Sequence, residues 1–262
     1  MKRILALTLA AMMMVLALAA CGGGSSDSDV AYVQDKGTLV VGITEFEPMD
    51  YTDASGNWIG FDADLATAFA ESLGVKAQFQ LIDWDNKVME LNDKAIDVVW
   101  NGMTLTADVQ AQMACSKPYF NNAQVVIVKA DVADQYQTPE SVAELNFAVE
   151  NGSAGMEQVA VLGAAYTPVA DQATALMEVA AGTSDAAVID YLMAAATVGE
   201  GTSYPDLTYT CELNAEEYGV GFRQGSDLAE KLNDFFVKSY EDGTMQAIAD
   251  TYGIGDKLIP QQ

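Results

Sequence analysis

Two short stretches of the sequence combine residue types that could hold a charged small molecule. The apolar run at residues 186–189 leads directly to Asp190, so a carboxylate would lie at the carboxyl end of a buried strand, where open α/β folds bind ligands. Asp190 could also cap the helix that follows it. Gly152, Ser153 and Ala154 form a turn before a predicted helix, whose first N–H groups favour an anion. An ordinary glycine turn with a serine cap would have the same sequence.

The composition restricts the chemistry that is possible. The chain has 262 residues with 38 Asp and Glu, 12 Lys and Arg, no His and a formal net charge of -26. Clustered basic residues are needed to bind phosphates, so we expect no nucleic-acid partner. The absence of His excludes His-based catalytic triads and the commonest metal ligand, and we expect no metal, no cofactor and no enzymatic activity.

The pattern of the chain after residue 37 alternates strands and helices, which predicts an α/β fold with parallel sheets. A helix is expected at residues 62–73, with Asp62 as its cap and Gly74 as its stop. Further helices are expected at residues 86–92, from about 156, and at 176–181, 227–241 and 244–252. Strands are expected at residues 38–43, 75–82, 96–100, 124–129, 146–149, 186–189, 207–210 and 218–222.

The N-terminus has the layout of an export signal. Lys2 and Arg3 precede an uninterrupted apolar run that ends in Leu18, Ala19, Ala20 and Cys21. This order resembles a bacterial lipobox, which implies a signal peptide at residues 1–20 and acylation of Cys21, for example with palmitate. Residues 21–37 would then be a flexible tether above the membrane. An ordinary secretory signal or a short anchor remains the alternative.

Several phrases, in order, resemble the solute-binding proteins of ABC importers, in the family that delivers polar amino acids (family 3). They include VGITEFEPMDY, GFDADL, ENGSAG, AAVIDY and EEYGVGFR, and together they extend over residues 38–254. The resemblance implies a two-lobed clamshell of the periplasmic-binding-protein type, in which each lobe is a mostly parallel sheet flanked by helices. Lobe 1 would be residues 38–121 and 217–262, lobe 2 residues 122–216, and two crossover strands near residues 119–125 and 217–221 would be the hinge.

The resemblance also implies a function. A monomer anchored to the cell surface or in the periplasm would capture an amino acid or similar solute between its lobes and deliver it to a permease. Asp190 would hold the ligand ammonium, Ser153 and Ala154 would offer N–H groups to its carboxylate, and Phe46 and Trp84 would contact it. The remaining expected contacts lie on lobe 1, namely Glu45, Asn101, Gly102, Met103, Thr104 and the residue at position 109.

The sequence departs from the family at one of these positions. The family usually has an arginine that forks onto the α-carboxylate, whereas this chain has Val109. Either N–H groups and Thr104 bind the carboxylate, or Lys117 or Lys87 substitutes, or the ligand is not an ordinary α-amino acid. Since acids remain while the arginine is absent, we expect a zwitterionic or cationic ligand.

Two questions stay open from the sequence. Cys115 and Cys211 could form a disulfide in an exported chain, or could be two separate buried thiols. The same fold could also serve as an exported enzyme of the dehydratase kind or as a ligand-binding sensor.

Overall fold

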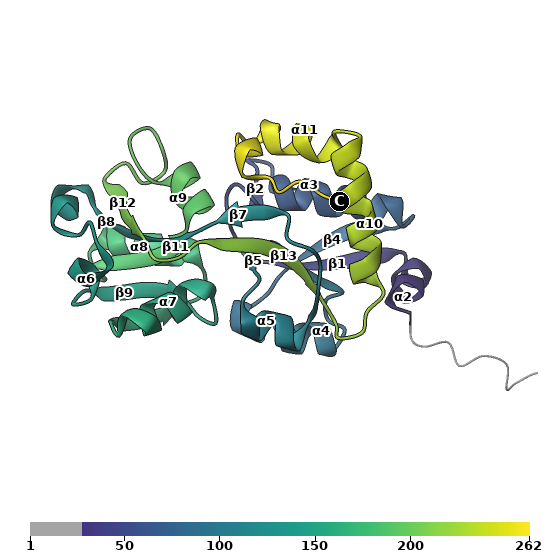
Figure 1. Cartoon of the computed structure of the whole chain (residues 1–262), viewed down its shortest axis with the longest axis horizontal. Coiled ribbons are helices and arrows are strands. Elements are labelled where there is room, and N and C mark those ends of the chain that lie inside the picture. The colour runs from purple at the N-terminus through teal and green to yellow at the C-terminus, as the bar shows by residue number, and fades with distance from the viewer. Residues whose placement is uncertain (1–27) are drawn as a thin grey trace, which may run out of the picture.

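Residues 28–262 form two lobes that lie side by side along the long axis of the molecule, as a computed structural model shows (Figure 1). The sheet of the first lobe has the order β4-β1-β5-β13-β6, with β7 also paired to β13. Its core strand β1 runs parallel to β4 and β5, whereas β13 is antiparallel to β5, β6 and β7. The strands are β1 (Thr38–Ile43), β4 (Lys76–Leu81), β5 (Val98–Thr104), β6 (Ala114–Cys115), β7 (Phe120–Asn122) and β13 (Glu216–Phe222), beside a small hairpin of β2 (Tyr51–Thr52) and β3 (Trp58–Ile59).

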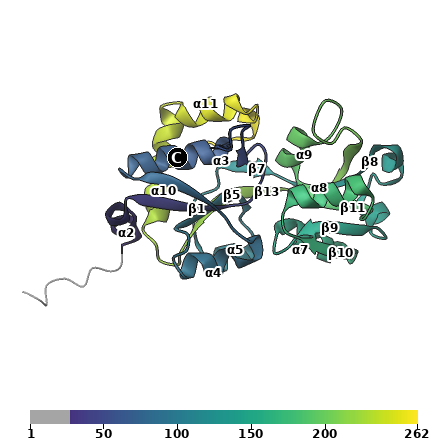
Figure 2. The ribbon, with the colours of Figure 1, turned by 180° about the vertical axis from the view of Figure 1, so that it is seen from behind.

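Helices cover both faces of this sheet because its buried strands present apolar side chains in both directions. Val41 and Val98 belong to the larger core, on the side of α3, α10 and α11, whereas Val40 and Val99 pack with Leu91 on the other side. Figures 1 and 2 show the two layers of helices on either side of the sheet. The helices are α3 (Phe61–Ser72), α4 (Lys87–Asn92), α5 (Ala107–Gln112), α10 (Leu228–Glu241) and α11 (Thr244–Thr251), with single 3-10 turns η1 (Trp84–Asn86) and η3 (Gly255–Lys257).

The second lobe repeats this layered plan around a sheet of order β10-β9-β11-β8-β12. Strand β9 is parallel to β10 and β11, and β8 is antiparallel to β11 and β12. Alternate residues of the strands pack against α8 on one face and against α7 on the other. The elements are β8 (Gln124–Lys129), η2 (Ala130–Gln135), α6 (Pro139–Val142), β9 (Asn146–Glu150), α7 (Ala154–Leu162), β10 (Ala165–Val169), α8 (Gln172–Ala181), β11 (Ala186–Asp190), α9 (Tyr191–Thr197) and β12 (Leu207–Glu212).

Two segments connect the lobes. The chain leaves the first sheet through β7, enters the second at β8, and returns from β12 into β13. Near the crossing, Glu216 of β13 is opposite Asn122 of β7 in an antiparallel pair. Figure 2 shows from behind that β7 and β13 extend toward the second lobe between the two bodies. Residues on these segments therefore lie at the base of the space between the lobes.

The α/β class and the two-lobed clamshell that we predicted are confirmed, and every predicted strand and helix overlaps an observed one. The sheets are more mixed than predicted, because each lobe joins a parallel unit to antiparallel crossing strands. Strand β5 also continues to Thr104, four residues beyond its predicted end. Asn101 and Gly102, which disfavour strands, follow Trp100, and the extension depends on pairing of Met103 and Thr104 with β13.

The predicted tether at residues 21–37 was too long. Helix α2 (Asp29–Lys36) is capped by Ser28, whose hydroxyl accepts from Ala31 N–H and donates to Asp227. Val33 is buried against the first lobe. This long-range anchoring gives the polar segment an ordered structure. The signal peptide and Cys21 lie outside the residues that the structure describes.

The prediction that Asp62 caps its helix was wrong. The helix begins after Gly60, and its N-cap residue, Gly60, makes no side-chain capping hydrogen bond within residues 28–262. Asp62 is instead fully buried, where its carboxylate accepts hydrogen bonds from Gly102 N–H at 2.6 Å and from the Tyr119 hydroxyl at 2.8 Å. Asp62, in the first turn of α3, therefore holds the neighbouring strand β5 through a hydrogen bond to its backbone.

Two further findings concern the cysteines and the length of the helices. Cys115 and Cys211 are both free thiols in this structure, one half-buried and the other buried. Within residues 28–262, no helix combines the length and apolar character that crossing a bilayer requires.

Candidate ligand-binding site

A pocket lies between the lobes, at the carboxyl ends of strands from both sheets. Strand β5 supplies its lobe 1 edge, and β9 and β11 end on its lobe 2 side. The carboxyl ends of parallel strands are where open α/β sheets bind ligands. The lining residues are Trp84, Lys87, Asn101, Gly102, Met103, Thr104, Thr106, Asp108 and Val109 from lobe 1, and Gln124, Glu150, Gly152, Ser153, Ala154, Glu157, Gln172 and Asp190 from lobe 2.

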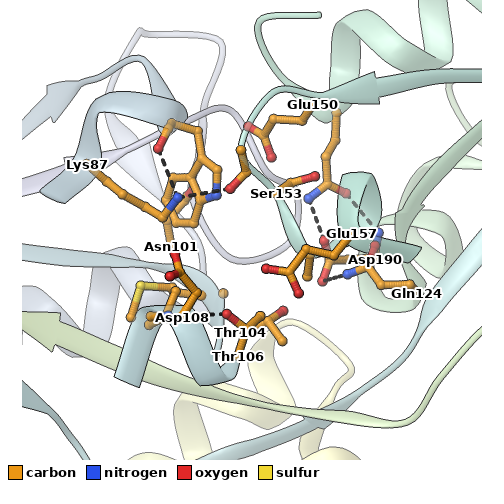
Figure 3. A pocket seen from close by; sticks show the side chains of 17 residues that line it. Lys87, Asn101, Thr104, Thr106, Asp108, Gln124, Glu150, Ser153, Glu157 and Asp190 are labelled. Carbon is orange, nitrogen blue, oxygen red and sulfur yellow. Dashed lines mark hydrogen bonds between the residues drawn. The ribbon is translucent and has the colours of Figure 1, made fainter. Parts of the chain in front are cut away.

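Asp190 is the last residue of β11, and its carboxylate is held entirely by neutral donors. It is 4% exposed. One oxygen accepts from the Tyr218 hydroxyl at 2.6 Å and the Gln124 amide at 3.1 Å, and the other accepts from the Gln172 amide. Figure 3 shows Gln124 beside Asp190. Asp190 occupies the cap position of α9, but its side chain makes no capping hydrogen bond. The side chain is therefore directed to the cleft rather than to the helix.

The environment of Asp190 opposes a negative charge. Burial, followed by the nearby charge of Glu216, raises its pKa to about 8. Asn122 Nδ2 donates to Asp190 at 2.5 Å and to Glu216 at 2.7 Å, so the two carboxylates share an amide donor. Gln124 Nε2 likewise donates to both Asp190 and Glu216. Amide donors stabilise a carboxylate without neutralising it, and a cation entering the pocket would supply the missing charge.

Glu150 is a second buried acid in the pocket. It ends β9, is 3% exposed, and its Oε1 has no hydrogen-bond partner in the described part of the chain. Burial and then the charge of Asp190 raise its pKa to about 8. A buried polar atom without a partner costs free energy, so Oε1 is available to a donor on a ligand.

The lobe 1 edge offers mainly backbone groups. The Asn101 side chain is used within the lobe, because its Oδ1 accepts from Thr44 and its Nδ2 donates to Asp50 at 2.8 Å. Gly102 has φ +53°, and a Cβ there would lie 2.5 Å from the Phe46 ring. The Thr104 hydroxyl donates to Glu216 at 3.0 Å. This edge is therefore a preformed surface held from behind by buried side chains.

On lobe 2, the start of α7 faces the pocket. Ser153 caps this helix by accepting from Met156 N–H at 3.1 Å, so the cap interpretation is confirmed. Gly152 has φ +69°, and a Cβ there would lie 2.6 Å from Asp85 of lobe 1. A glycine is thus required both by the turn and by the close approach of the two lobes.

Lys87 reaches across from lobe 1 to this turn. Its Nζ donates to the carbonyl oxygens of Trp84 at 3.1 Å and of Gly152 at 3.0 Å (Figure 3). The ammonium also lies 4.9 Å from the centre of the Trp84 ring. Lys87 is 7% exposed, and burial lowers its pKa.

The charges that line the pocket are mostly negative. Asp190 and Glu150 lie in its interior, and the exposed side chains of Asp108 and Glu157 belong to the two opposite lobes. Lys87 is the one basic residue among the lining residues. The arrangement suits a ligand with at least one positive group.

Comparison with known proteins agrees with this geometry. The family of bacterial extracellular solute-binding proteins, family 3, matches residues 39–255. The chain belongs to this family.

This solute-binding protein is similar to several amino-acid-binding proteins. A probable histidine-binding protein of Neisseria gonorrhoeae is 31% identical over 246 residues, which cover 90% of this chain and 91% of the relative. The arginine-binding extracellular protein ArtP of Bacillus subtilis is 28% identical over 266 residues, covering 98% and 100%. A crystal structure of a mutant arginine-binding protein from T. maritima superposes with a TM-score of 0.80 at 30% identity, covering 86% of this chain and 98% of that one.

One relative is an enzyme. Cyclohexadienyl dehydratase of Pseudomonas aeruginosa is 28% identical over 126 residues, which cover 48% of this chain and 47% of the enzyme. Binding proteins thus match over nearly the whole solute-binding protein, and the enzyme matches over about half of it.

Most of the predicted contact residues lie together in the pocket of the solute-binding protein. They are Trp84, Asn101, Gly102, Met103, Thr104, Val109, Ser153, Ala154 and Asp190. Whether each contacts a ligand stays a prediction. Lys87 also lines the pocket, whereas Lys117 is exposed and donates to the backbone of Gln262, so Lys117 is no longer a candidate to replace the missing arginine.

Two predicted contacts are not part of the pocket lining. Phe46 is 2% exposed and packs edge-on against Tyr218 behind Gly102, where it supports the lobe 1 edge. Glu45 is half-buried near Thr52, whose hydroxyl donates to it at 3.4 Å. The loop after β1 turns inward, because Phe46 N–H and the Asp50 carbonyl pair in an isolated bridge.

The sequence reasoning missed several pocket residues. Glu150 follows an apolar strand as Asp190 does, and the same signal would have found it. Gln124 and Gln172 begin elements in an otherwise apolar context, and only the tertiary structure brings them to Asp190. Thr106, Asp108 and Glu157 lie on exposed helix starts that resemble ordinary surface positions.

Proposed function

We propose that this protein captures an amino acid with a positive charge, zwitterionic or cationic, between its lobes and delivers it to the permease of an ABC importer. The observation that carries the proposal is Asp190, a buried carboxylate at a strand end that only neutral groups compensate. A ligand ammonium there would provide the cation that the protein lacks. The named specificities of the relatives, for histidine, arginine and cystine, support an amino-acid ligand.

The other pocket groups suit the rest of such a ligand. Ala154 lies at the first turn of α7, where backbone N–H groups have no acceptor within the helix and the helix dipole favours a carboxylate. Glu150 and Glu157 would face a cationic side chain. The two ends of the ligand would then contact both lobes, so binding favours the closed arrangement and couples capture to recognition by the permease.

A ligand panel tests the proposal. Purified protein is mixed with amino acids, amines, peptides and organic acids, and its unfolding temperature is recorded. A ligand at 100 times its Kd stabilises the folded state by about 2.7 kcal/mol, which corresponds to a rise of roughly 5–10 °C. We expect arginine, lysine or histidine to give such a rise. A panel without any shift would contradict the amino-acid function.

The preference for a positive charge has its own test. Citrulline has nearly the shape of arginine without its charge, so it should bind at least tenfold more weakly if arginine is a ligand. Glu157→Gln should narrow this difference in affinity between arginine and citrulline. Glu144→Gln, on the exposed surface of the same lobe, is the matched control and should leave the difference unchanged. Equal binding of arginine and citrulline would contradict the charge preference.

We further propose that the protein is exported as a monomer and anchored through acylated Cys21, either on a Gram-positive surface or in a periplasm. The support is the lipobox-like sequence before Cys21 and the extracellular family. Cells fed labelled palmitate should incorporate it into the wild-type protein and into Cys115→Ser. Cys21→Ser should lose the label, and retention of label in this variant would contradict the anchor.

A dehydratase function is the second candidate. It is supported by the partial similarity to cyclohexadienyl dehydratase and by Glu150, a buried acid with a free oxygen and a pKa of about 8 that could donate a proton near neutral pH. Incubation with prephenate-like acids followed by detection of an aromatic product tests it. If no product forms even at high protein concentration, the dehydratase function is contradicted and the transport function remains.

A further inference from the structure

Lys87 is a buried cation without an anionic partner. The side chain is 7% exposed, yet within residues 28–262 no carboxylate oxygen lies within the 4.0 Å of an ion pair with its Nζ. Lysine is rarely buried unless it is paired, because an uncompensated charge is costly to remove from water. The other buried cation, Arg223, contacts Asp29 at 3.0 Å. The difference points to an anion that the protein itself does not contain.

The position of the ammonium shows where that anion would sit. Lys87 Nζ donates to the Gly152 carbonyl, one residue before the cap of α7, and to the Trp84 carbonyl. Two of its three N–H groups are therefore used by neutral carbonyl oxygens, and the third is left for another acceptor. The nine-residue helix α7 directs its positive end to the same place. Figure 3 shows Lys87 and Ser153 on opposite walls of the pocket.

The neighbouring side chains do not neutralise the ammonium of Lys87. The acids near it in the described part of the chain are Glu150, Asp85, Asp108 and Glu157, and none of them forms an ion pair with it. Val109, which also lines this part of lobe 1, is apolar and offers no hydrogen bond from its side chain. A carboxylate at the start of α7 would thus find one cation among the pocket residues, and it is Lys87.

We propose that Lys87 binds the ligand carboxylate at the N-terminus of α7, so that the protein selects amino acids over the amines that lack only the carboxylate. The inference rests on the proposed amino-acid function and specifies the ligand class. Because Lys87 belongs to lobe 1 and Gly152 and α7 belong to lobe 2, the carboxylate would be held from both sides of the cleft. Carboxylate binding would then contribute directly to closure.

The test uses ligand pairs that differ by the carboxylate alone. They are arginine and agmatine, histidine and histamine, and cystine and cystamine, with affinities measured by calorimetry. A hydrogen bond to a charged group contributes enough that we expect the amino acid of the binding pair to be preferred about 10- to 100-fold. Lys87→Met should reduce this preference to less than about threefold, because the carboxylate loses its cation.

Four further variants make the result specific. Lys87→Arg should keep most of the preference, because the charge remains. Lys117→Met removes an exposed lysine outside the pocket and should change nothing. In the Lys87→Met background, Val109→Arg should restore the preference, because it returns a cation to the same wall. If Lys87→Met does not fold, Lys87→Gln retains a donor without the charge and should show the same loss of preference.

The outcomes separate the inference from the function on which it depends. If Lys87→Met weakens amino acid and amine equally, or keeps the preference, Lys87 is not the carboxylate partner although amino acids bind. If wild-type protein binds the amine as tightly as the amino acid, the inference is overturned and a cationic ligand remains. If no member of any pair binds, the proposed function fails together with the inference.

Discussion

Two groups of buried acids in this protein have opposite kinds of partner. In lobe 1, Asp97 is fully buried and pairs with Lys36 at 2.6 Å, while Arg223 joins Asp97 to Asp29. At the cleft, Asp190 is held by amides and a tyrosine hydroxyl. The first group contains its own cations and serves the scaffold. The second has no cationic partner and lines the pocket. Asp62 in lobe 1 also has only neutral partners but lies outside the pocket, so a binding site is recognised by the missing cation and the pocket together.

Arg223 should be the most sensitive position for stability. It also donates to the carbonyl oxygens of Leu91 and Ile96, so its removal leaves Asp29 without its cation and two carbonyls without their donor, while Asp97 keeps Lys36. Removal of one member of a buried ion pair costs about 3–5 kcal/mol. We expect Arg223→Met to lower the free energy of unfolding by this amount in urea titrations. A loss below about 1 kcal/mol would show that the two acid groups do not differ as described.

Asp190→Asn should show the reverse pattern, with a large effect on binding and a small one on folding. The substitution removes the charge that a ligand cation needs, and we expect a loss of about 2–5 kcal/mol in binding free energy by calorimetry. At about pH 4, where the folded protein holds Asp190 protonated, the free energy of unfolding without ligand should change by no more than about 1 kcal/mol, because only neutral hydrogen bonds are altered. If Asp190→Asn and Arg223→Met lowered the free energy of unfolding equally, Asp190 would serve the scaffold in the same way as the acids around Arg223.

The pH dependence of stability should reveal the uncompensated acid. The pKa of Asp190 rises from 3.8 in the unfolded chain to about 8 in the folded one, so between these values the folded state holds a proton that the unfolded state has lost. Stability therefore falls as pH rises through this window, by at most about 1.4 kcal/mol per pH unit for this group. Above the folded pKa the contribution is constant.

Urea titrations of wild type and Asp190→Asn from about pH 4 to 9, which spans the two pKa values, check this expectation. The free energy of unfolding of the wild type should decline relative to the variant as pH increases. A difference that grows in favour of the wild type would mean that Asp190 is stabilised as a carboxylate. With a cationic ligand, binding below about pH 8 should release protons, which calorimetry in buffers of different ionisation enthalpy detects.

Lys36→Met should have the smallest effect. Its side chain is 27% exposed, so water and salt screen the pair with Asp97. Partly exposed ion pairs contribute about 0.2–1 kcal/mol, and we expect a loss in this range that shrinks in high salt. Arg223→Met measured in the same titrations is the reference. If Lys36→Met lowered the free energy of unfolding as much as Arg223→Met does, Lys36 and not Arg223 would be the main cation that balances Asp97.

Local pattern was sufficient to predict much of the fold and part of the site. Runs such as residues 38–43 and 124–129 are predicted as strands and form strands in the structure, because side-chain periodicity reflects burial on one or both faces. Asp190 could be recognised because it follows an apolar strand. Phe46 could not be placed, since a loop aromatic can face either a ligand or the core, and here the contact with Gly102 decides.

By itself, the sequence determined the α/β class, the resemblance to solute-binding proteins, the acidic character of the cleft and the loss of an arginine at Val109. Only the tertiary structure decided which cation accompanies which acid. It placed Arg223 with Asp29 and Asp97, and within residues 28–262 it left Lys87 and Asp190 without charged partners. The physical reason is that these partners are far apart in the chain, and their pairing depends on strand register and on the approach of two lobes, which local periodicity does not encode.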